Sequence, residues 1–537
     1  MKGLDFNIFK SPSLVLAETE QGWEKLMPAA DSVWSTGHVA VTMKLRESAA
    51  DMGLYLESKK SAVHTIRIRW NHSFTRPVTL LGDHWERGYG DMGWSGLQPE
   101  RVMPWYFMIH DGLSTAGFGV KTGAGSMCCW QVDADGVTLT ADVSSGSQGV
   151  TLGNRILKFA ELVQVHGGEN MTPYETTRML CSSMCEQPVL PSVPVYGGNN
   201  WYYAYGKSSH HQIVEDSQFI SAMAEGLTNR PFMVIDDGWQ ISSGTCNGGP
   251  WIGNRDFPDM AELADEMKQA GVRPGIWCRP LLTQEKVPES WVRYTKGGHF
   301  LDPSRPDVLE YVANMMSRMH EWGYELIKHD FSTFDLFGQW GFQMKGKAHA
   351  LPYALSDTSR TTAEIVLDLY RTIAEASKDS LIIGCNTIGH LAAGLFEIQR
   401  TGDDTSGRSW ERTRRMGVNT LAFRMPQHGT LFSHDADCVG ITSGVPWEFN
   451  RQWLDLLANS GTPLFVSADQ KELSGQQKRE VRQAFEAASR PLPTAEPLDW
   501  MYNSCPSLWK ISGETRNYSW NGEAVLGAGA RDHEWWR

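Results

Sequence analysis

The stretch DVLEYVANMMSRMHEWGYELIKHD (307–330) contains a helix followed directly by a strand. Apolar residues in 307–323 recur at helical spacing, and Gly323 is a typical helix stop. The short run YELIKHD (324–330) that follows has the length and apolar content of a buried strand. The stretch therefore predicts one helix–strand unit of an α/β fold.

The same unit recurs on both sides of this stretch. Downstream, TAEIVLDLYRTIAEAS (362–377) is predicted to be a helix and LIIGCN (381–386) a strand. Upstream, PFMVIDDGW (231–239) and VRPGIWCRP (272–280) are predicted strands on either side of a helix, PDMAELADEMKQAG (258–271). This alternation predicts a parallel sheet. Polar residues recur at successive strand ends, which favours a closed (β/α)8 TIM barrel over an open sheet.

The flanking regions have a different pattern. The first third carries short alternating or β-branched segments, at 38–45, 64–70, 116–122 and 137–143, which predict an antiparallel β-sandwich. A proline-rich linker, QPVLPSVPVYGG (187–198), separates it from the barrel. Strand-like pieces at 506–513 and 516–522 predict a small β unit at the end. The expected domains are a β-sandwich at 1–188, a catalytic barrel at 189–491 and a C-terminal β unit at 492–537.

Composition excludes several classes of protein. With 41% hydrophobic and 21% charged residues, the chain is neither disordered nor fibrous. A net charge of −13 disfavours nucleic acid as a partner. No apolar run is long enough to span a membrane, and residues 1–16 lack the apolar core of a secretion signal. The nine cysteines lack zinc-ligand spacing, so we expect free thiols in a reducing cytoplasm, and neither a metal nor another cofactor.

Charged residues follow most of the predicted barrel strands. A single carboxylate there often caps the next helix. Acidic clusters at several strand ends, with Lys and Arg among them, are harder to explain in this way, because buried like charges repel. The strand ends carry, in chain order, Asn200-Trp201, Asp236-Asp237, Trp277 with Arg279, Lys328 with Asp330, Cys385-Asn386, Arg400 with Asp403-Asp404, and Asp435 with Asp437.

Cleavage of a glycoside needs two carboxyl groups on either side of an anomeric carbon. Lys328 lies two residues before Asp330 and should point to the same face of the strand. A neighbouring cation favours an ionised carboxylate, so Asp330 suits the nucleophile. Asp403 lies about two β/α units further on and can face Asp330 across the barrel mouth.

Several motifs in this order resemble glycoside hydrolase clan D, families 36 and 27. They are VIDDGWQ (234–240), IKHDF (327–331), RTGDDTS (400–406) and HDADCVGI (434–441), and the similarity spans about 195–445. The β-rich first third and DHWERGYGDMGW (83–94) look more like family 36. The resemblance implies a retaining, exo-acting α-glycosidase, in the first place an α-galactosidase.

The resemblance also implies roles for individual residues. Asp330 matches the nucleophile, and Lys328 a lysine that contacts the sugar. Asp403 matches the general acid/base, with Asp404 as the alternative if the alignment slips by one. The remaining matches are to substrate-binding positions: Asp236 and Asp237 for the sugar 4- and 6-hydroxyls, Trp201 and Trp277 as aromatic neighbours, and Arg279, Cys385, Asn386, Arg400 and Asp437 around the pocket.

Some alternatives stay open. Arg279 stands where family 36 often has Glu, and either contacts substrate or pairs with an acidic residue. His329 replaces an aromatic residue. Trp85, Tyr89 and Trp94 either line the pocket or pack between domains. The glycone could also be N-acetylgalactosamine, β-L-arabinopyranose or glucose. A metal-dependent barrel hydrolase and a non-catalytic sugar-binding protein are the rival classes, and a homo-oligomer is possible.

Overall fold

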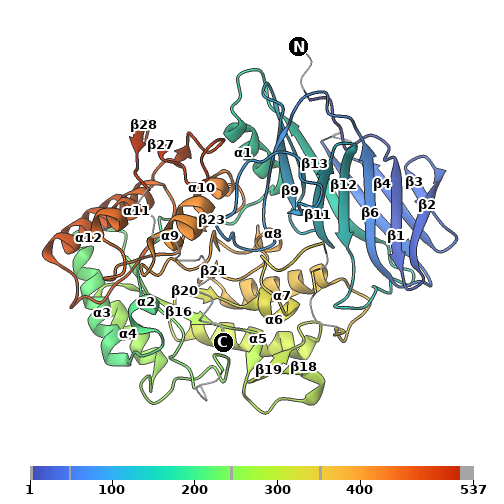
Figure 1. Cartoon of the computed structure of the whole chain (residues 1–537). Coiled ribbons are helices and arrows are strands. Elements are labelled where there is room, and N and C mark those ends of the chain that lie inside the picture. The colour runs from blue at the N-terminus through green and yellow to red at the C-terminus, as the bar shows by residue number, and fades with distance from the viewer. Residues whose placement is uncertain (1–3, 47–49, 242–245, 347, 350–352, 521–537) are drawn as a thin grey trace.

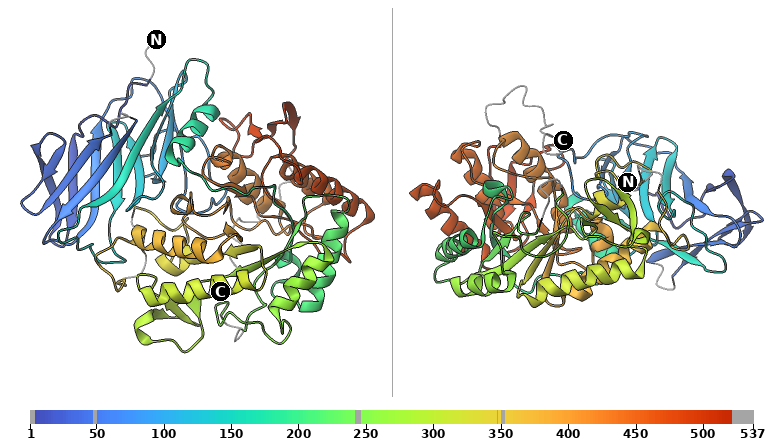
Figure 2. Two further views of the ribbon diagram at one scale, coloured as in Figure 1. Left: turned by 180° about the vertical axis from the view of Figure 1, so that it is seen from behind. Right: turned by 90° about the horizontal axis from the view of Figure 1, so that it is seen from below.

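The computed structural model describes residues 4–46, 50–241, 246–346, 348–349 and 353–520. It confirms the predicted fold class: an N-terminal antiparallel β domain, a parallel barrel with interleaved helices and a small C-terminal sheet. In Figures 1 and 2 the N-terminal sheet lies beside the barrel, with α11 and α12 on the side of the barrel away from it. The predicted domain boundaries at 188/189 and 491/492 stay predictions.

Strands of the N-terminal domain pair antiparallel, and some of them bury alternate residues. In β4 (Val39–Leu45), Val39, Val41 and Met43 are buried while Ala40 and Thr42 are half-exposed, which is the period of two expected for a strand with one face on the core. The other strands are β1 (Leu14–Thr19), β2 (Gly22–Ala30), β3 (Val33–Ser35), β5 (Asp51–Ser58), β6 (Val63–Asn71), β7 (Thr79–Gly82), β8 (Met103–Pro104), β9 (Tyr106–His110), β10 (Thr115–Val120), β11 (Met127–Asp133), β12 (Gly136–Asp142) and β13 (Leu157–His166).

The central sheet is parallel and closes on itself. Its strands are, in sheet order, β14 (Tyr196–Asn199), β15 (Phe232–Ile235), β16 (Arg273–Cys278), β20 (Leu326–His329), β21 (Leu381–Gly384), β22 (Ile398–Arg400), β23 (Ser433–Asp435), β24 (Cys438–Gly440) and β25 (Leu464–Ser467). β23 pairs with β22, and β24 with β25, which in turn pairs with β14. β23 and β24 are two halves of one strand, interrupted where Asp437 adopts a φ of +69°. Because all strands of this closed sheet run parallel, their carboxyl ends lie together at one rim of the barrel.

The longer helices that follow the barrel strands cover the outside of the barrel because each has one apolar face. In α5 (Pro306–Glu321), Val308, Val312, Met315 and Met319 are buried on one side, and Pro306 stands at the first turn, where its missing N–H is not needed. The other helices are α1 (Pro173–Met184), α2 (Trp201–Ala204), α3 (His210–Met223), α4 (Met260–Ala270), α6 (Ser332–Phe337), α7 (Thr362–Ser377), α8 (Gly389–Ala392), α9 (Trp410–Arg412), α10 (Thr420–Arg424), α11 (Trp447–Asn459) and α12 (Gly475–Ala488).

Smaller elements complete the fold. β17 (Leu282–Thr283), β18 (Val292–Thr295) and β19 (His299–Leu301) form a three-stranded sheet between β16 and α5. A π-helical segment (Thr413–Asn419) joins α9 to α10, and 3-10 turns lie at Glu289–Trp291 and Met425–Gln427. The C-terminal sheet contains β26 (Glu496–Pro497), β27 (Leu508–Ile511) and β28 (Glu514–Asn517).

Several element boundaries differ from the sequence prediction. The strand expected over 231–239 ends at Ile235, so that Asp236 and the residues after it lie on the rim. The linker expected over 187–198 already contains the start of β14 at Tyr196. The last strand predicted, at 516–522, begins earlier, at Glu514, and its residues from 521 onward lie outside the described part of the chain. Within the described ranges, every helix is too short or too polar to cross a bilayer.

Candidate active site

A cavity of about 360 Å³ opens at the carboxyl rim of the barrel. The structure brings eight of the predicted site residues together around it: Trp201, Asp236, Asp237, Trp277, Lys328, Asp330, Cys385 and Asp404. The sequence did not indicate the other lining residues, which are Arg87, Tyr202, Tyr205, Asn247, Phe331, Trp340, Ser406 and Arg412. The cavity lies within the size range of small-molecule sites, roughly 300–1,000 Å³.

Asp330 follows β20 and is held by two N–H donors. The indole Nε1 of Trp277 donates to Oδ2 over 3.1 Å, and the backbone N–H of Phe331 donates to Oδ1 over 2.7 Å. Phe331 adopts a left-handed φ of +64°, a conformation that costs free energy in a bulky residue and is concentrated at functional sites. The Asp330 carboxyl is thereby fixed at the cavity wall in one orientation.

Lys328 lines the same cavity as Asp330 but forms its salt bridge with Asp236. Its Nζ lies 2.6 Å from Oδ2 of Asp236, which also accepts a hydrogen bond of 2.8 Å from Asn199. The ammonium group therefore neutralises Asp236 at the end of β15. Alternation along β20 still directs Lys328 and Asp330 into the cavity, while His329 between them is buried on the other side.

Asp237 is half-buried beside Asp236. Burial raises the pKa of its carboxyl to about 6, although the hydrogen bond of 2.7 Å from Gln240 favours the ionised form. One carboxylate of the pair is thus neutralised by Lys328, and the other titrates close to neutral pH. Together they offer up to four acceptor oxygens at one side of the cavity.

The adjacent Asp403 and Asp404 have opposite surroundings. Asp403 is buried between two arginines: Arg87 Nη2 lies 3.0 Å from Oδ1, and Arg412 Nη2 lies 2.7 Å from Oδ2. Burial opposes ionisation of Asp403, but the two guanidinium groups outweigh it and hold its pKa at about 2. Asp404 lines the cavity, and burial together with the negative Asp403 raises its pKa. The described residues that line the cavity do not include Asp403.

Arg400 and Asp437 lie behind the cavity wall. Arg400 Nη2 lies 2.6 Å from Asp437 and 3.2 Å from Asp404, and its Nη1 donates to the sulfur of Cys385 over 3.1 Å. Asp437 also accepts hydrogen bonds from the hydroxyl of Tyr202 and from the backbone N–H of Thr405, at 2.7 Å for the latter. Both residues therefore orient groups that line the cavity.

Arg279 pairs with an acidic residue and also lines the wider groove outside the cavity, so the pairing does not decide between the two interpretations. Its guanidinium lies 2.6 Å from Asp335, a buried residue of α6, and 4.1 Å from the ring centroid of Phe331. Asn386 is likewise buried away from the cavity, where its side-chain amide donates to Glu86. Arg279 thus contacts the lining residue Phe331, and Asn386 contacts Glu86, the neighbour of the lining residue Arg87.

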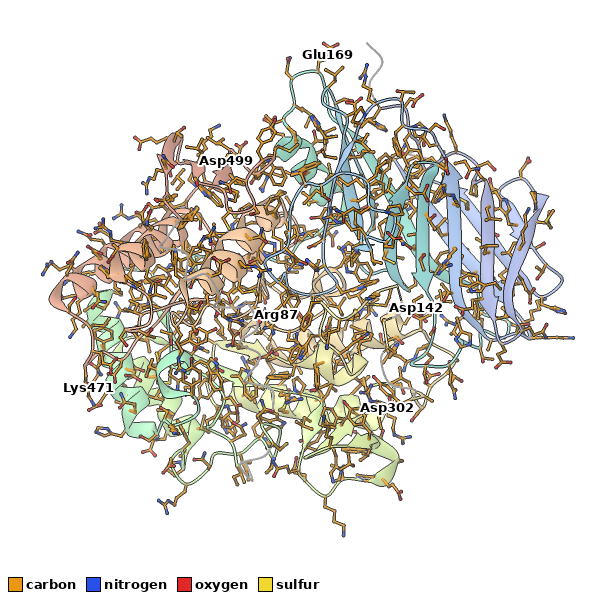
Figure 3. The ribbon with its side chains drawn as sticks, in the orientation of Figure 1. Arg87, Asp142, Glu169, Asp302, Lys471 and Asp499 are labelled. Atoms are coloured by element: carbon orange, nitrogen blue, oxygen red, sulfur yellow. The ribbon has the colours of Figure 1, made fainter. Side chains whose placement is uncertain are left out.

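Arg87 belongs to the N-terminal domain and lines the cavity. Figure 3 labels it in the region between the N-terminal sheet and the barrel. Its segment docks on the barrel through a backbone bond from Gly88 to Thr401 (2.7 Å) and an ion pair between Asp83 and Arg424 (2.7 Å). Trp85, Tyr89 and Trp94 are not among the lining residues. Trp85, for example, donates to the backbone oxygen of Lys345 over 3.2 Å. Only the motif DHWERGYGDMGW (83–94) marked this segment in the sequence.

The described residues contain no group of three or more His, Cys, Asp or Glu side chains arranged to hold a metal ion. The two adjacent histidines at the start of α3 are also not part of such a group: His210 pairs with Glu266 at 3.3 Å, and His211 is exposed.

A wider groove of about 1,090 Å³ continues outward from the cavity and shares Trp201, Asp237 and Trp340 with it. Beyond them the groove is lined by Gln240, Asn254, Phe300 and Phe334 among others. Polar and aromatic side chains along a groove suit a ligand with hydroxyl groups and flat C–H faces.

A comparison with protein family models finds none that matches the chain. Among solved structures, the chain is similar to an α-galactosidase of Thermus thermophilus in complex with p-nitrophenyl α-D-galactopyranoside, with a TM-score of 0.58 and 16% identity over 89% of this chain and 99% of that one. It is also similar to the family 36 α-galactosidase AgaA of Geobacillus stearothermophilus, with a TM-score of 0.62 and 12% identity over 94% of this chain and 79% of that one. The predicted resemblance to clan D, family 36, is confirmed for the fold.

Proposed function

We propose that the chain is a retaining, exo-acting α-glycoside hydrolase, in the first place an α-galactosidase. The observation that carries the proposal is the pair of carboxyl groups on the cavity wall, Asp330 and Asp404, which come from two different strand ends and have different surroundings. Two N–H donors hold Asp330, whereas burial and the neighbouring Asp403 raise the pKa of Asp404. A nucleophile and a proton donor are what retaining hydrolysis requires.

In the first half-reaction an Asp330 oxygen forms a bond to the anomeric carbon while the bond from that carbon to the leaving oxygen breaks. Asp404 gives its proton to the leaving oxygen. In the second half-reaction water attacks the anomeric carbon, Asp404 takes up the proton of that water, and the bond to Asp330 breaks. Atoms and charge balance without a metal or cofactor.

The proposal assigns the acid/base role to Asp404 rather than to Asp403, the residue that the sequence favoured. A carboxyl group held by two arginines, with a pKa of about 2, is ionised at neutral pH and has no proton to give. It is also hidden behind the wall that the substrate would touch. Asp404 meets both conditions: it reaches the cavity and its raised pKa favours the protonated form.

Galactose as the glycone rests on Asp236 and Asp237. Carboxylate oxygens side by side can accept hydrogen bonds from two neighbouring sugar hydroxyls, and Lys328 beside them can donate one. The outer groove supplies space for the rest of a glycoside or oligosaccharide. The relatives support this: the Thermus enzyme has also been solved with stachyose, and an AgaA variant with raffinose. N-acetylgalactosamine, β-L-arabinopyranose and glucose remain the alternative glycones.

The test is a panel of aryl α-galactoside, α-N-acetylgalactosaminide, α-glucoside and β-L-arabinopyranoside, assayed with and without excess chelator. We expect the α-galactoside to be cleaved fastest, at a rate that chelation leaves unchanged. Asp330→Asn should abolish turnover. Asp216→Asn is the control for the loss of a buried carboxylate, because Asp216 lies on α3 and is not among the residues that line the cavity. Full activity in Asp330→Asn, or a strict need for a metal, would refute the mechanism.

Asp404→Ala should slow poor leaving groups by about 10²- to 10⁴-fold and activated aryl leaving groups far less, because only the former need a proton. Equal losses on both would contradict the acid/base role of Asp404. The same comparison made on Asp403→Asn separates the two neighbouring residues directly.

A further inference from the structure

We propose that Arg87, a residue of the N-terminal domain, is a positioning residue for the catalytic acid: by pairing with Asp403 it fixes the proton on Asp404. The inference rests on the proposed function and extends it, because it makes the N-terminal domain part of the proton-transfer apparatus rather than only a neighbour of the barrel.

The contacts of Asp403 are the first step of the argument. Each of its oxygens faces a different guanidinium group, Arg87 at 3.0 Å and Arg412 at 2.7 Å. Arg412 lies on α9, close in sequence, and its Nε also donates to the backbone oxygen of Asp404 over 2.8 Å. Arg87 comes from the other domain. One anchor of the Asp403–Asp404 pair is therefore local, and the other depends on how the domains dock.

The docking of the Arg87 segment is the second step. Glu86, the preceding residue, is buried and accepts hydrogen bonds from the backbone N–H of Gly341 at 2.7 Å and from the side chain of Asn386. Gly88, the following residue, donates to Thr401 at 2.7 Å, two residues before Asp403. Backbone and side-chain bonds on both sides of Arg87 thus hold its guanidinium against Asp403.

The charge of Asp403 acts on the carboxyl group of Asp404. Two carboxyl groups that interact in this way take up their first proton as a pair, and the protein must select which of them carries it. Cations on both sides of Asp403 make it the ionised member. If Arg87 loses its charge, Asp403 keeps only Arg412, and the proton moves to Asp403 in a fraction of the molecules. Those molecules lack a proton on the cavity side and cannot protonate a leaving group.

The test compares Arg87→Met with Arg87→Lys on an alkyl and on an activated aryl α-galactoside. We expect Arg87→Met to lower kcat for the alkyl substrate about 10- to 100-fold more than for the aryl substrate, within the range that acid catalysis supplies. Arg87→Lys should recover most of that difference. The basic limb of the kcat/KM profile should move to higher pH in Arg87→Met, because Asp403 and Asp404 as a pair have lost a cation that favours release of their shared proton.

Arg178→Met is the matched control. Arg178, on α1, also joins the N-terminal region to the barrel, by a bond of 2.8 Å to the backbone of His428, but it has no contact with Asp403 among the described residues. We expect it to change both substrates by the same factor. Equal losses on the two substrates in Arg87→Met would overturn the inference. If Asp404→Ala also lacks leaving-group dependence, the proposed function fails with it; if Asp404→Ala shows it, only the role of Arg87 fails.

Discussion

Replacing His329 by Phe should stabilise the protein, and more so in acid. His329 lies between Lys328 and Asp330 on β20 but points to the outside of the barrel, where it is fully buried against Tyr370 and Phe396. Both of its ring nitrogens lack a hydrogen-bond partner within the described ranges of the chain. Burial alone lowers the pKa of the ring to about 3. A neutral polar ring in an apolar site is costly, and a charged one more so.

The magnitude follows from proton linkage. Above about pH 6.5 the ring is neutral in the folded and in the unfolded state, and pH has no effect on stability. Below that value the unfolded state binds a proton and the folded state does not. The free energy of unfolding therefore decreases by about 1.36 kcal/mol for each unit by which pH is lowered, until the folded pKa of about 3 is reached. At about pH 5 this histidine therefore costs about 2 kcal/mol more than at neutral pH.

The measurement is the free energy of urea unfolding of the wild type and His329→Phe at about pH 5 and about pH 7.5. The increase in the free energy of unfolding from wild type to His329→Phe should be about 2 kcal/mol larger at the lower pH. Other titrating groups contribute equally to both proteins and cancel in the difference. His329→Met is the control for packing: its effect at neutral pH will differ, but its pH-dependent increment should be the same. An increment near zero in both variants would refute the reasoning.

Two further predictions concern Asp237, in the site, and Gly407, whose backbone packs closely on that of Gly440. In the wild type, KM for the α-galactoside should fall as pH rises through about 6, because the ionised Asp237 is the better acceptor for sugar hydroxyls. In Asp237→Asn, KM should be constant over this range. A pH dependence of KM that persists in this variant would contradict the role of Asp237 in binding the sugar. Gly407→Ala should prevent folding, measured as soluble yield and circular dichroism, because its Cβ would lie 1.8 Å from the backbone oxygen of Gly440; Gly153→Ala, also at positive φ but in open space, is the control and should fold.

Regular elements and the residues at their ends could be predicted from the sequence. The helix–strand unit at 307–330 has one apolar helix face and a strand of fixed alternation, and those two periodicities direct Lys328 and Asp330 to the cavity. Arg87 could not be predicted in this way, because it reaches the cavity by docking between domains and no local pattern encodes that contact. Trp340 lies in an irregular segment after α6, where no periodicity fixes its direction.

The choice between Asp403 and Asp404 shows where local reasoning ends. On a strand, adjacent side chains point to opposite faces, so the position of a residue in the sequence predicts the direction of its side chain. β22 ends at Arg400, and the turn that follows carries no such rule. The direction of Asp403 is instead fixed by Arg87 and Arg412, of which one belongs to another domain and the other to the next helix. The identity of the proton donor is therefore a property of the assembled fold, and removing either arginine should weaken it.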